Sequence, residues 1–111
     1  MTVKYLHIRY GTLDPLGSGV EVDNKGGATI AYTELDGFIC LAPAWCSIED
    51  NFSREVGRTI AADRLRKDGP WEILEGVPPT DRIIDWCCDN LFSKPVYIHR
   101  CGHRWMITEV E

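Results

Sequence analysis

The stretch ATIAYTELDGFICLAP, residues 28–43, decides the fold class of this chain. Residues that favour strands alternate on both sides of Asp36–Gly37, and an Asp-Gly pair is a strong signal for a two-residue hairpin turn. The stretch therefore predicts two antiparallel strands, 28–35 and 38–43. Upstream, VKYLHIRY at 3–10 alternates with the same period and predicts a further strand.

A short return strand is expected within VEVDNKGG at 20–27, which would make the first 43 residues an antiparallel meander. The hydrophobic period then changes to that of a helix, which we expect to cover residues 50–67. Ser47 or Asp50 is the expected N-cap, and Gly69 the residue that follows the helix.

The remaining predicted elements are a strand at 71–74, a helix over DRIIDWCCDNLF at 81–92, and strands at 95–100 and 104–110. The order is roughly β-β-β-β-α-(β)-α-β-β, with helices in the middle of the chain. This order is typical of an α+β fold, in which an antiparallel sheet packs against two helices that lie on one face. A length of 111 residues predicts a single domain, 1–111.

Composition limits the classes of function. The chain carries a net charge of −5, which argues against broad binding to duplex nucleic acid, because such binding relies on many lysine and arginine contacts to phosphate. A local anion site needs only a few cations and stays open. No apolar run is long enough to cross a bilayer, and the charged, alternating start of the chain does not resemble a signal peptide.

Five cysteines are expected to be reduced thiols in a cytosolic compartment, because their number is odd and no export signal is present. A metal site is one alternative, since His99, Cys101 and His103 follow each other at period two and Cys87 or Cys88 could complete a ligand set. The paired C-x-x-C spacing of structural zinc sites is missing, however, so we expect no metal and no cofactor. A cysteine nucleophile activated by one of these histidines is a weaker alternative still.

The first helix has two unusual features. At 100° per residue an apolar stripe forms on one side, comprising Phe52, Val56 and Ile60. Gly57 lies in mid-helix, where glycine costs about 1 kcal/mol relative to alanine, so a close approach of another backbone or a ligand is expected there. Arg54 and Arg58 share an exposed line. They form either a solvated helix face or a phosphate-binding pair, and spacing alone leaves both interpretations open.

One segment resembles a known family of proteins: GGATIAYTELDGFICLAPAWCSIEDNFSREVGRTIAADRL, residues 26–65 of 111. A Gly-Gly strand opening is followed by an alternating hairpin, by Cys46, Asp50 and Phe52 in a Cys-x-x-x-Asp-x-Phe element, and by Gly-Arg-x-Ile-Ala-x-x-Arg-Leu at 57–65. This pattern resembles the first-described family of phage anti-Thoeris proteins. The Gly-Arg-x-Ile-Ala piece is its most specific part, and the last 40 residues carry no match.

The resemblance implies a protein that is not an enzyme. Such proteins act in the cytoplasm of the infected bacterial host, where they bind and sequester a cyclic ADP-ribose signal made by a TIR defence enzyme. They form dimers or higher homo-oligomers with ligand pockets between protomers, and some members also hold cyclic oligonucleotides. The implied ligand contacts are Arg58, Arg64 and Arg54 for the phosphates, Phe52 or Trp45 for the adenine, and Thr29 or Asn51 for a ribose.

A different class of function is a small acidic phage inhibitor that occupies the surface of a partner protein, as anti-CRISPR proteins do. Trp71, Trp86 and Trp105 could supply the anchors of such an interface. The two classes are distinguished by their binding partner, because a nucleotide sponge binds its nucleotide alone, whereas an inhibitor forms a complex only with its target.

Overall fold

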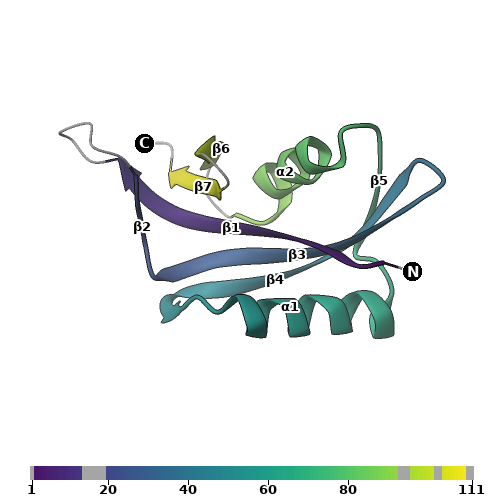
Figure 1. Cartoon of the computed structure of the whole chain (residues 1–111), viewed down its shortest axis with the longest axis horizontal. Coiled ribbons are helices and arrows are strands. Elements are labelled where there is room, and N and C mark those ends of the chain that lie inside the picture. The colour runs from purple at the N-terminus through teal and green to yellow at the C-terminus, as the bar shows by residue number, and fades with distance from the viewer. Residues whose placement is uncertain (1, 14–19, 93–95, 102–103, 110–111) are drawn as a thin grey trace.

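The computed structural model describes residues 2–13, 20–92, 96–101 and 104–109. The elements are β1 (Lys4–Leu13), β2 (Val20–Val22), β3 (Lys25–Leu35), β4 (Phe38–Asn51), α1 (Arg54–Asp63), a π-helical turn (Arg64–Asp68), β5 (Glu72–Glu75), α2 (Pro79–Asn90), β6 (Val96–Cys101) and β7 (Arg104–Glu109) (Figure 1). This is the expected α+β class with the expected order of strands and helices.

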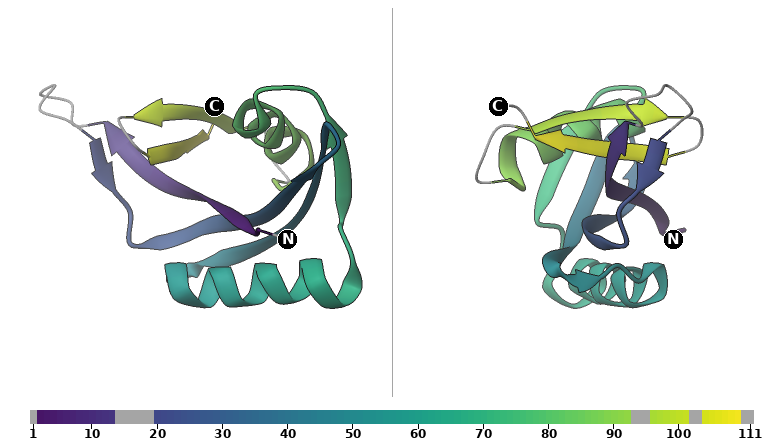
Figure 2. Two further views of the ribbon diagram at one scale, coloured as in Figure 1. Left: turned by 45° about the vertical axis from the view of Figure 1, so that its right-hand side comes forward. Right: turned by 90° about the vertical axis from the view of Figure 1, so that its left-hand side faces the viewer.

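One curled sheet contains all the strands, in the order β5-β4-β3-β1-β7-β6, with β2 paired to β1 beyond this path (Figure 2). Neighbouring strands are antiparallel except for β1 and β7, which run parallel with Ile8 opposite Trp105. The parallel pair places the last strands beside the first one. Residues from both ends of the described chain therefore share one surface.

The β3–β4 hairpin confirms the prediction from the opening stretch. Leu35 pairs with Phe38 across a two-residue turn in which Asp36 has φ 51° and Gly37 has φ 83°. Positive φ at both central residues is what a tight hairpin turn requires, and Asp-Gly meets that requirement at low cost. The pairing then continues without interruption from Leu35 to Gly27 on β3.

The predicted start of the first helix was wrong. β4 continues as a strand to Asn51, because Cys46 pairs with Gly27 and Asn51 pairs with Lys25 across an irregularity in the ladder. The N-cap is Ser53, which is extended at φ −127° and accepts a hydrogen bond from the amide of Val56 at 3.2 Å. Helix α1 consequently begins at Arg54, and its expected last turn is π-helical.

The two helices lie on opposite faces of the sheet, which corrects the expectation that they share one face (Figures 1 and 2). The face toward α2 holds one core cluster, including Ile8, Ile30 and Leu41 packed with Ile83. The opposite face holds a second cluster, in which the small residues Ala31, Ala42 and Ala44 pack against Ala61 and Leu65. Most of β3 and the first part of β4, from Ile39 to Ala44, are therefore covered on both faces.

The apolar stripe of the first helix does not face the core. Val56 is 56% exposed and Ile60 is 40% exposed, whereas Ala61, Ala62 and Leu65 are buried. The reason is that the sheet face beneath α1 is lined by alanines, so the helix comes close only with its own small residues turned inward. The larger Val56 and Ile60 are left facing solvent, and they form one wall of the groove described next.

Among the described residues, neither helix has the length and apolar character needed to cross a bilayer. The four cysteines whose side chains are described, Cys40, Cys46, Cys87 and Cys88, form no disulfide with one another. The side chain of Cys101 lies outside the described residues.

Candidate functional site

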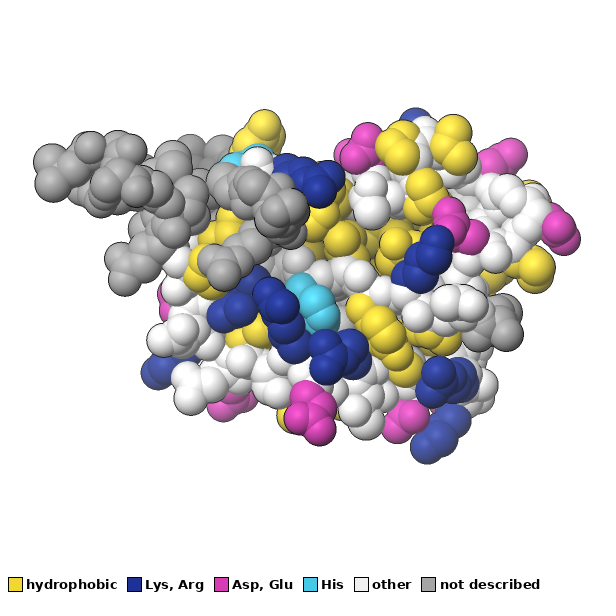
Figure 3. All heavy atoms as spheres, viewed as in Figure 1, with side chains coloured by type: hydrophobic (Ala, Val, Ile, Leu, Met, Phe, Trp, Pro, Cys, Tyr) yellow, Lys and Arg dark blue, Asp and Glu magenta, His cyan; other side chains and the backbone are white. Residues whose placement is uncertain are grey.

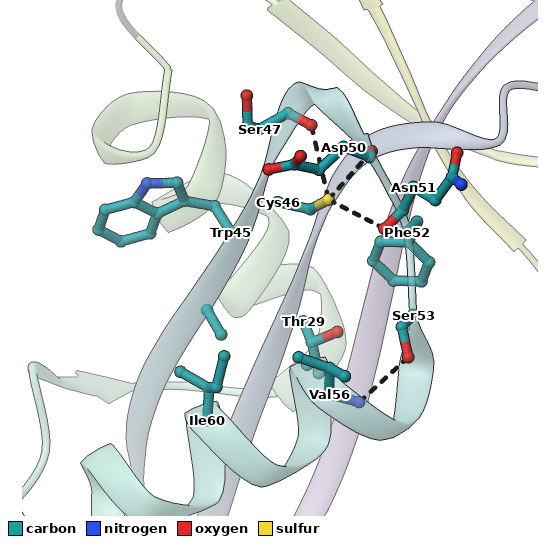
Figure 4. Close-up of a pocket in the computed structure, with 12 residues that line it drawn as sticks. Thr29, Trp45, Cys46, Ser47, Asp50, Asn51, Phe52, Ser53, Val56 and Ile60 are labelled. Atoms are coloured by element: carbon teal, nitrogen blue, oxygen red, sulfur yellow. Dashed lines mark hydrogen bonds between the residues drawn. The ribbon is translucent and has the colours of Figure 1, made fainter.

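A groove opens between α1 and the last part of β4 (Figure 4). We call it the apolar groove; its walls include Trp45, Phe52, Val56 and Ile60, with Asn51 and Ser53 among the polar residues. Its cavity volume is about 260 Å³. Trp45 and Phe52 lie at opposite ends of the groove, and the two aliphatic side chains project from α1 between them.

The Gly26–Gly27 pair positions the Phe52 end of the groove. Gly27 has φ +113°, and a side chain there would collide with the carbonyl oxygen of Ile8 and lie 3.1 Å from the Phe52 ring. The Phe52 amide donates to the carbonyl of Asn24 at 2.8 Å. The glycines thus allow the end of β4 to fold back over β3, which brings the Phe52 ring to the groove.

The floor of the groove is set by Gly57 and Thr29. A β-carbon on Gly57 would collide with the hydroxyl of Thr29, which is fully buried on β3. The close approach expected at the mid-helix glycine is therefore made by a strand side chain. The absence of a side chain at Gly57 lets α1 lie directly on the sheet and leaves the hollow between Val56 and Ile60.

The turn at the rim of the groove is held by a thiol. Cys46 Sγ lies 3.5 Å from the carbonyl oxygen of Ser47, 3.3 Å from that of Asp50 and 3.5 Å from that of Asn51, and it can donate to each as a weak hydrogen bond (Figure 4). These contacts hold together the segment that connects the buried part of β4 to α1. They keep Asp50 and Asn51 beside the groove.

At the other end, Trp45 belongs to an aromatic cluster. Its ring meets that of Trp71 edge to face with centroids 5.6 Å apart. The Arg64 guanidinium lies 5.5 Å from the Trp45 ring and 5.3 Å from the Trp71 ring, and it donates to the carbonyl of Pro43 at 2.9 Å. The Arg64 guanidinium therefore interacts with groups of the protein itself, and its contact with the Trp45 ring helps to hold that ring at the groove.

Phe52 lines the apolar groove and also contacts His7 and Arg9, which line a second hollow. On its far side the His7 ring meets it edge to face at 5.9 Å, and the Arg9 guanidinium lies 4.3 Å from its centroid. His7 Nδ1 is 2.8 Å from the Thr29 hydroxyl oxygen. Burial, followed by the charges of Arg54, Arg58 and Arg9, lowers the pKa of His7 from 6.5 to about 4, so that its imidazole is neutral at pH 7.

The second hollow, which we call the basic concavity, has a volume of about 320 Å³ and is lined by His7, Arg9, Arg54, Arg100, Thr80 and Trp105 among others. On the face seen in Figure 3, arginine and lysine side chains gather beside a histidine above α1. A third hollow, of about 290 Å³, mixes Arg58 and Arg66 with Glu55 and Asp63.

The structure thus brings together four of the seven residues that the resemblance implied as ligand contacts: Thr29, Trp45, Asn51 and Phe52 all line the apolar groove. Arg54 lies in the basic concavity, Arg58 in the third hollow, and Arg64 against the two tryptophans. The three arginines do not line one hollow, although Arg54 and Arg58 lie one turn apart on the same side of α1.

Sequence reasoning missed Val56 and Ile60 as groove walls, and it missed His7 and Arg9 altogether. The exposure of the two aliphatic residues could have been inferred from the alanines on strands 28–35 and 38–43, which favour a helix face of small residues. His7 and Arg9 alternate with the apolar residues of β1, so the period of the strand could have placed both on its second face, but nothing local indicates which element covers that face.

In chemical terms the apolar groove can stack a flat ring and bind its polar edge, and the basic concavity can attract an anion. No group of three or more histidine, cysteine, aspartate or glutamate side chains suited to a metal lies within the described part of the chain. Most of the proposed His99, Cys101 and His103 set falls outside that part, since His103 and the Cys101 side chain are not described.

No family model, curated protein or solved structure matches this chain in comparisons of its sequence and fold.

Proposed function

We propose that this chain captures a cyclic ADP-ribose signal in the cytoplasm of an infected bacterial host and holds it without cleaving it. The observation that supports the proposal is the apolar groove, where Trp45 and Phe52 present rings at two ends and Val56 and Ile60 expose apolar surface along a wall. Aromatic stacking contributes ~1–3 kcal/mol per base in single-stranded nucleic-acid complexes, and the same contact is available to an adenine here.

The rim of the groove offers hydrogen-bonding groups to the polar parts of such a ligand. Asn51 carries both an amide donor and a carbonyl acceptor, and Asp50 and Ser47 add a carboxylate and a hydroxyl. These groups suit the amino edge of adenine and the hydroxyls of a ribose. A mainly apolar pocket with a few placed polar groups is the usual form of a small-molecule site.

The phosphates of the ligand would lie toward the start of α1. Ser53 lines the groove and caps the helix, so the positive end of the helix dipole is directed there. The groove's volume of about 260 Å³ is small for the whole ligand. One chain would therefore enclose the base and its ribose, and a second copy would cover the rest, consistent with the homo-oligomers of the family that the sequence resembles.

Calorimetry of the purified chain with cyclic ADP-ribose isomers tests this function. We expect saturable binding and recovery of the intact ligand after the protein is unfolded by heat. Trp45→Ala should weaken binding roughly ten- to a hundred-fold through the loss of one stacking partner. The matched control is Tyr97→Ala, which removes another aromatic side chain that is 63% exposed on β6 and lies outside the groove.

Two results would contradict the proposal. Absence of binding to every isomer would remove the function, and a cleaved ligand after incubation would show an enzyme in place of a sponge. An unchanged affinity in Trp45→Ala would move the site away from the groove.

A second candidate function is inhibition by protein–protein binding, and one observation favours it. Trp45, Ile48, Val56 and Trp71 are each about half exposed or more, at 56%, 70%, 56% and 47%, which is a large amount of apolar surface for one region. Of the three tryptophans expected as anchors, Trp71 is exposed, whereas Trp86 and Trp105 pack against the core. A complex with a TIR enzyme or its effector, formed without nucleotide, would support this candidate.

A further inference from the structure

The side of the sheet that carries α1 extends beyond the helix. α1 and its π-helical turn end at Asp68, and the chain changes direction at Gly69, which has φ +80°. The β3–β4 hairpin continues past this point, and its end curls away from α1 (Figures 1 and 2). Side chains that project from the α1 side of the hairpin end are therefore beyond the reach of the helix.

Three large apolar side chains share this end of the sheet. Leu35 on β3 is paired with Phe38 on β4, and Ile73 on β5 is paired with Cys40, two residues along β4 from Phe38. Paired residues and residues two apart on a strand project from the same face, and Cys40 packs against the core cluster on the α1 side. Leu35, Phe38 and Ile73 therefore all point to that side, and we call them the hairpin face.

The hairpin face is continuous and exposed. Leu35 is 58% exposed, Phe38 45% and Ile73 55%, whereas Ala31 and Ala42, further along the same side of the sheet, are fully buried beneath the helix. Directly paired residues have Cβ atoms about 4.5–5.5 Å apart, and diagonal neighbours are within reach of an aromatic side chain. Adjoining apolar side chains that are exposed together indicate an interaction surface, unlike single ones scattered over a protein.

The charges beside the hairpin face are negative. Asp36 lies in the hairpin turn, and Glu75 is paired with Phe38 and so shares its face. Both are exposed, and within the described part of the chain neither forms an ion pair, whereas Glu34 bonds to Lys4 at 2.7 Å. In Figure 3 acidic and hydrophobic side chains lie beside one another at the right-hand end of the molecule. A binding partner for this face should therefore be both apolar and basic.

We propose that the hairpin face binds an amphipathic helix of a partner protein, with large apolar side chains on one side of the helix and lysine or arginine beside them. The occupant is a helix because a helix covers the rest of this side of the sheet, where α1 lies over Ala31 and Ala42. A second copy of the chain is disfavoured, because a twofold contact through this face would bring Asp36 and Glu75 close to their own counterparts.

Synthetic peptides of about 14 residues, or roughly four helical turns, serve as the probe. The first has leucines along one side of the helix and lysines on the other, the second has the same composition in scrambled order, and the third has glutamate in place of lysine. Fluorescence anisotropy of the labelled peptides measures binding to the full chain. We expect saturable, salt-sensitive binding of the first peptide, binding at least ten-fold weaker for the scrambled one, and none for the third.

Variants of the apolar residues locate the binding surface. Phe38→Ser and Ile73→Ser should each weaken binding of the first peptide about ten-fold or more, because each removes apolar surface that the helix would cover. The matched control is Ile48→Ser, since Ile48 is 70% exposed near the other end of β4, and it should leave the affinity unchanged. Circular dichroism and thermal unfolding check the fold of each variant, and Leu35→Ser replaces any that is unfolded.

A second pair of variants tests the charges. Glu75→Gln should reduce the salt dependence of binding, because it removes a carboxylate beside the hairpin face. Asp85→Asn makes the same change of net charge at an exposed position on α2, on the opposite side of the sheet, and should leave the salt dependence as it is in the parent.

The proposal fails if the scrambled or the glutamate peptide binds as tightly as the first, or if Ile48→Ser weakens binding as much as Ile73→Ser. It is also overturned if sedimentation shows a dimer that Ile73→Ser abolishes, which would assign the face to a second copy. Binding to phosphatidylserine vesicles that Ile73→Ser abolishes would assign it to a membrane instead. Ile73→Ser should bind cyclic ADP-ribose as the parent does, so that failure of nucleotide capture would refute the proposed function alone.

Discussion

The backbone of Gly57 lies against the side chain of Thr29 so closely that a β-carbon could not fit between them. This contact decides how near α1 comes to the sheet, and so it determines the depth of the apolar groove.

Gly57→Ala should destabilise the protein by up to about 2 kcal/mol. Alanine gains about 1 kcal/mol of helix propensity over glycine, but overpacking at a tight contact costs about 1–3 kcal/mol, and the nearest atoms belong to a buried strand. Urea unfolding measures the change in free energy. The double variant Gly57→Ala/Thr29→Ala removes the hydroxyl and should recover part of the loss, which a double-mutant cycle would show. A stabilised Gly57→Ala would mean that the helix is free to move away.

His7 predicts a pH dependence of stability. Its folded pKa of about 4 lies below the unfolded value of 6.5, so the unfolded state binds more protons between these values. Stability should therefore fall as pH decreases from about 6.5 toward 4. After discounting for partial solvent exposure, the loss that belongs to His7 is roughly 1–2 kcal/mol.

His7→Gln keeps a hydrogen-bonding group near Thr29 but does not titrate. The difference in unfolding free energy between the parent and His7→Gln should shrink or reverse as pH falls through this window. Parallel pH profiles for the two proteins would show that His7 is not held neutral in the folded state.

Replacement of Arg64 should lower the stability of the protein, whether or not the residue also contacts a ligand. Arg64→Ala removes the hydrogen bond to the Pro43 carbonyl and the cation–π contacts with Trp45 and Trp71, at a cost of about 1–2 kcal/mol. Tryptophan fluorescence should change in the folded state because both rings lose their shared neighbour. Arg58→Ala is the comparison, since Arg58 is exposed on the same helix, and we expect it to leave stability nearly unchanged. Equal stability of Arg64→Ala and the parent would show that these contacts of Arg64 do not stabilise the fold.

The cysteines should differ in reactivity. Burial strongly raises the pKa of the Cys87 thiol, which is fully inaccessible, so little thiolate is available for alkylation. Cys46 is partly exposed at the groove, and it should be modified in the native protein long before Cys87. Mass spectrometry of peptides after timed alkylation measures both. A ligand in the groove should slow Cys46 and leave Cys40 unaffected, and rapid labelling of Cys87 would indicate an open core.

The parts of the fold that the sequence predicted are those set by neighbours along the chain. The Asp36–Gly37 turn was predicted correctly because the preference of an Asp-Gly pair for a two-residue hairpin turn depends on these two residues alone. The start of α1 was missed because the segment after Pro43 stays extended through its pairing with β3, a partner that local periodicity cannot identify. The positions of the helices on opposite faces depend likewise on residues far apart in the sequence.

The candidate site divides in the same way. Trp45, Asn51 and Phe52 lie close together in sequence, and all three line the apolar groove. Which side of α1 turns inward depends on the size of Ala31 and Ala42 on the sheet, so the exposure of the larger helix residues could be seen only after the two layers were assembled. The basic concavity was not predicted at all, since β1, α1 and β6 contribute its arginines separately.

The parallel pairing of β1 with β7 has a consequence for biosynthesis. During translation the first strand leaves the ribosome long before its late partner exists, so one edge of β1 must wait without its hydrogen-bonding neighbour. Such pairings raise the contact order and slow folding, because a long loop must close before they form. The nascent chain should therefore acquire the hairpin and α1 early, and it should gain the Arg100 side of its surface only near the end of synthesis.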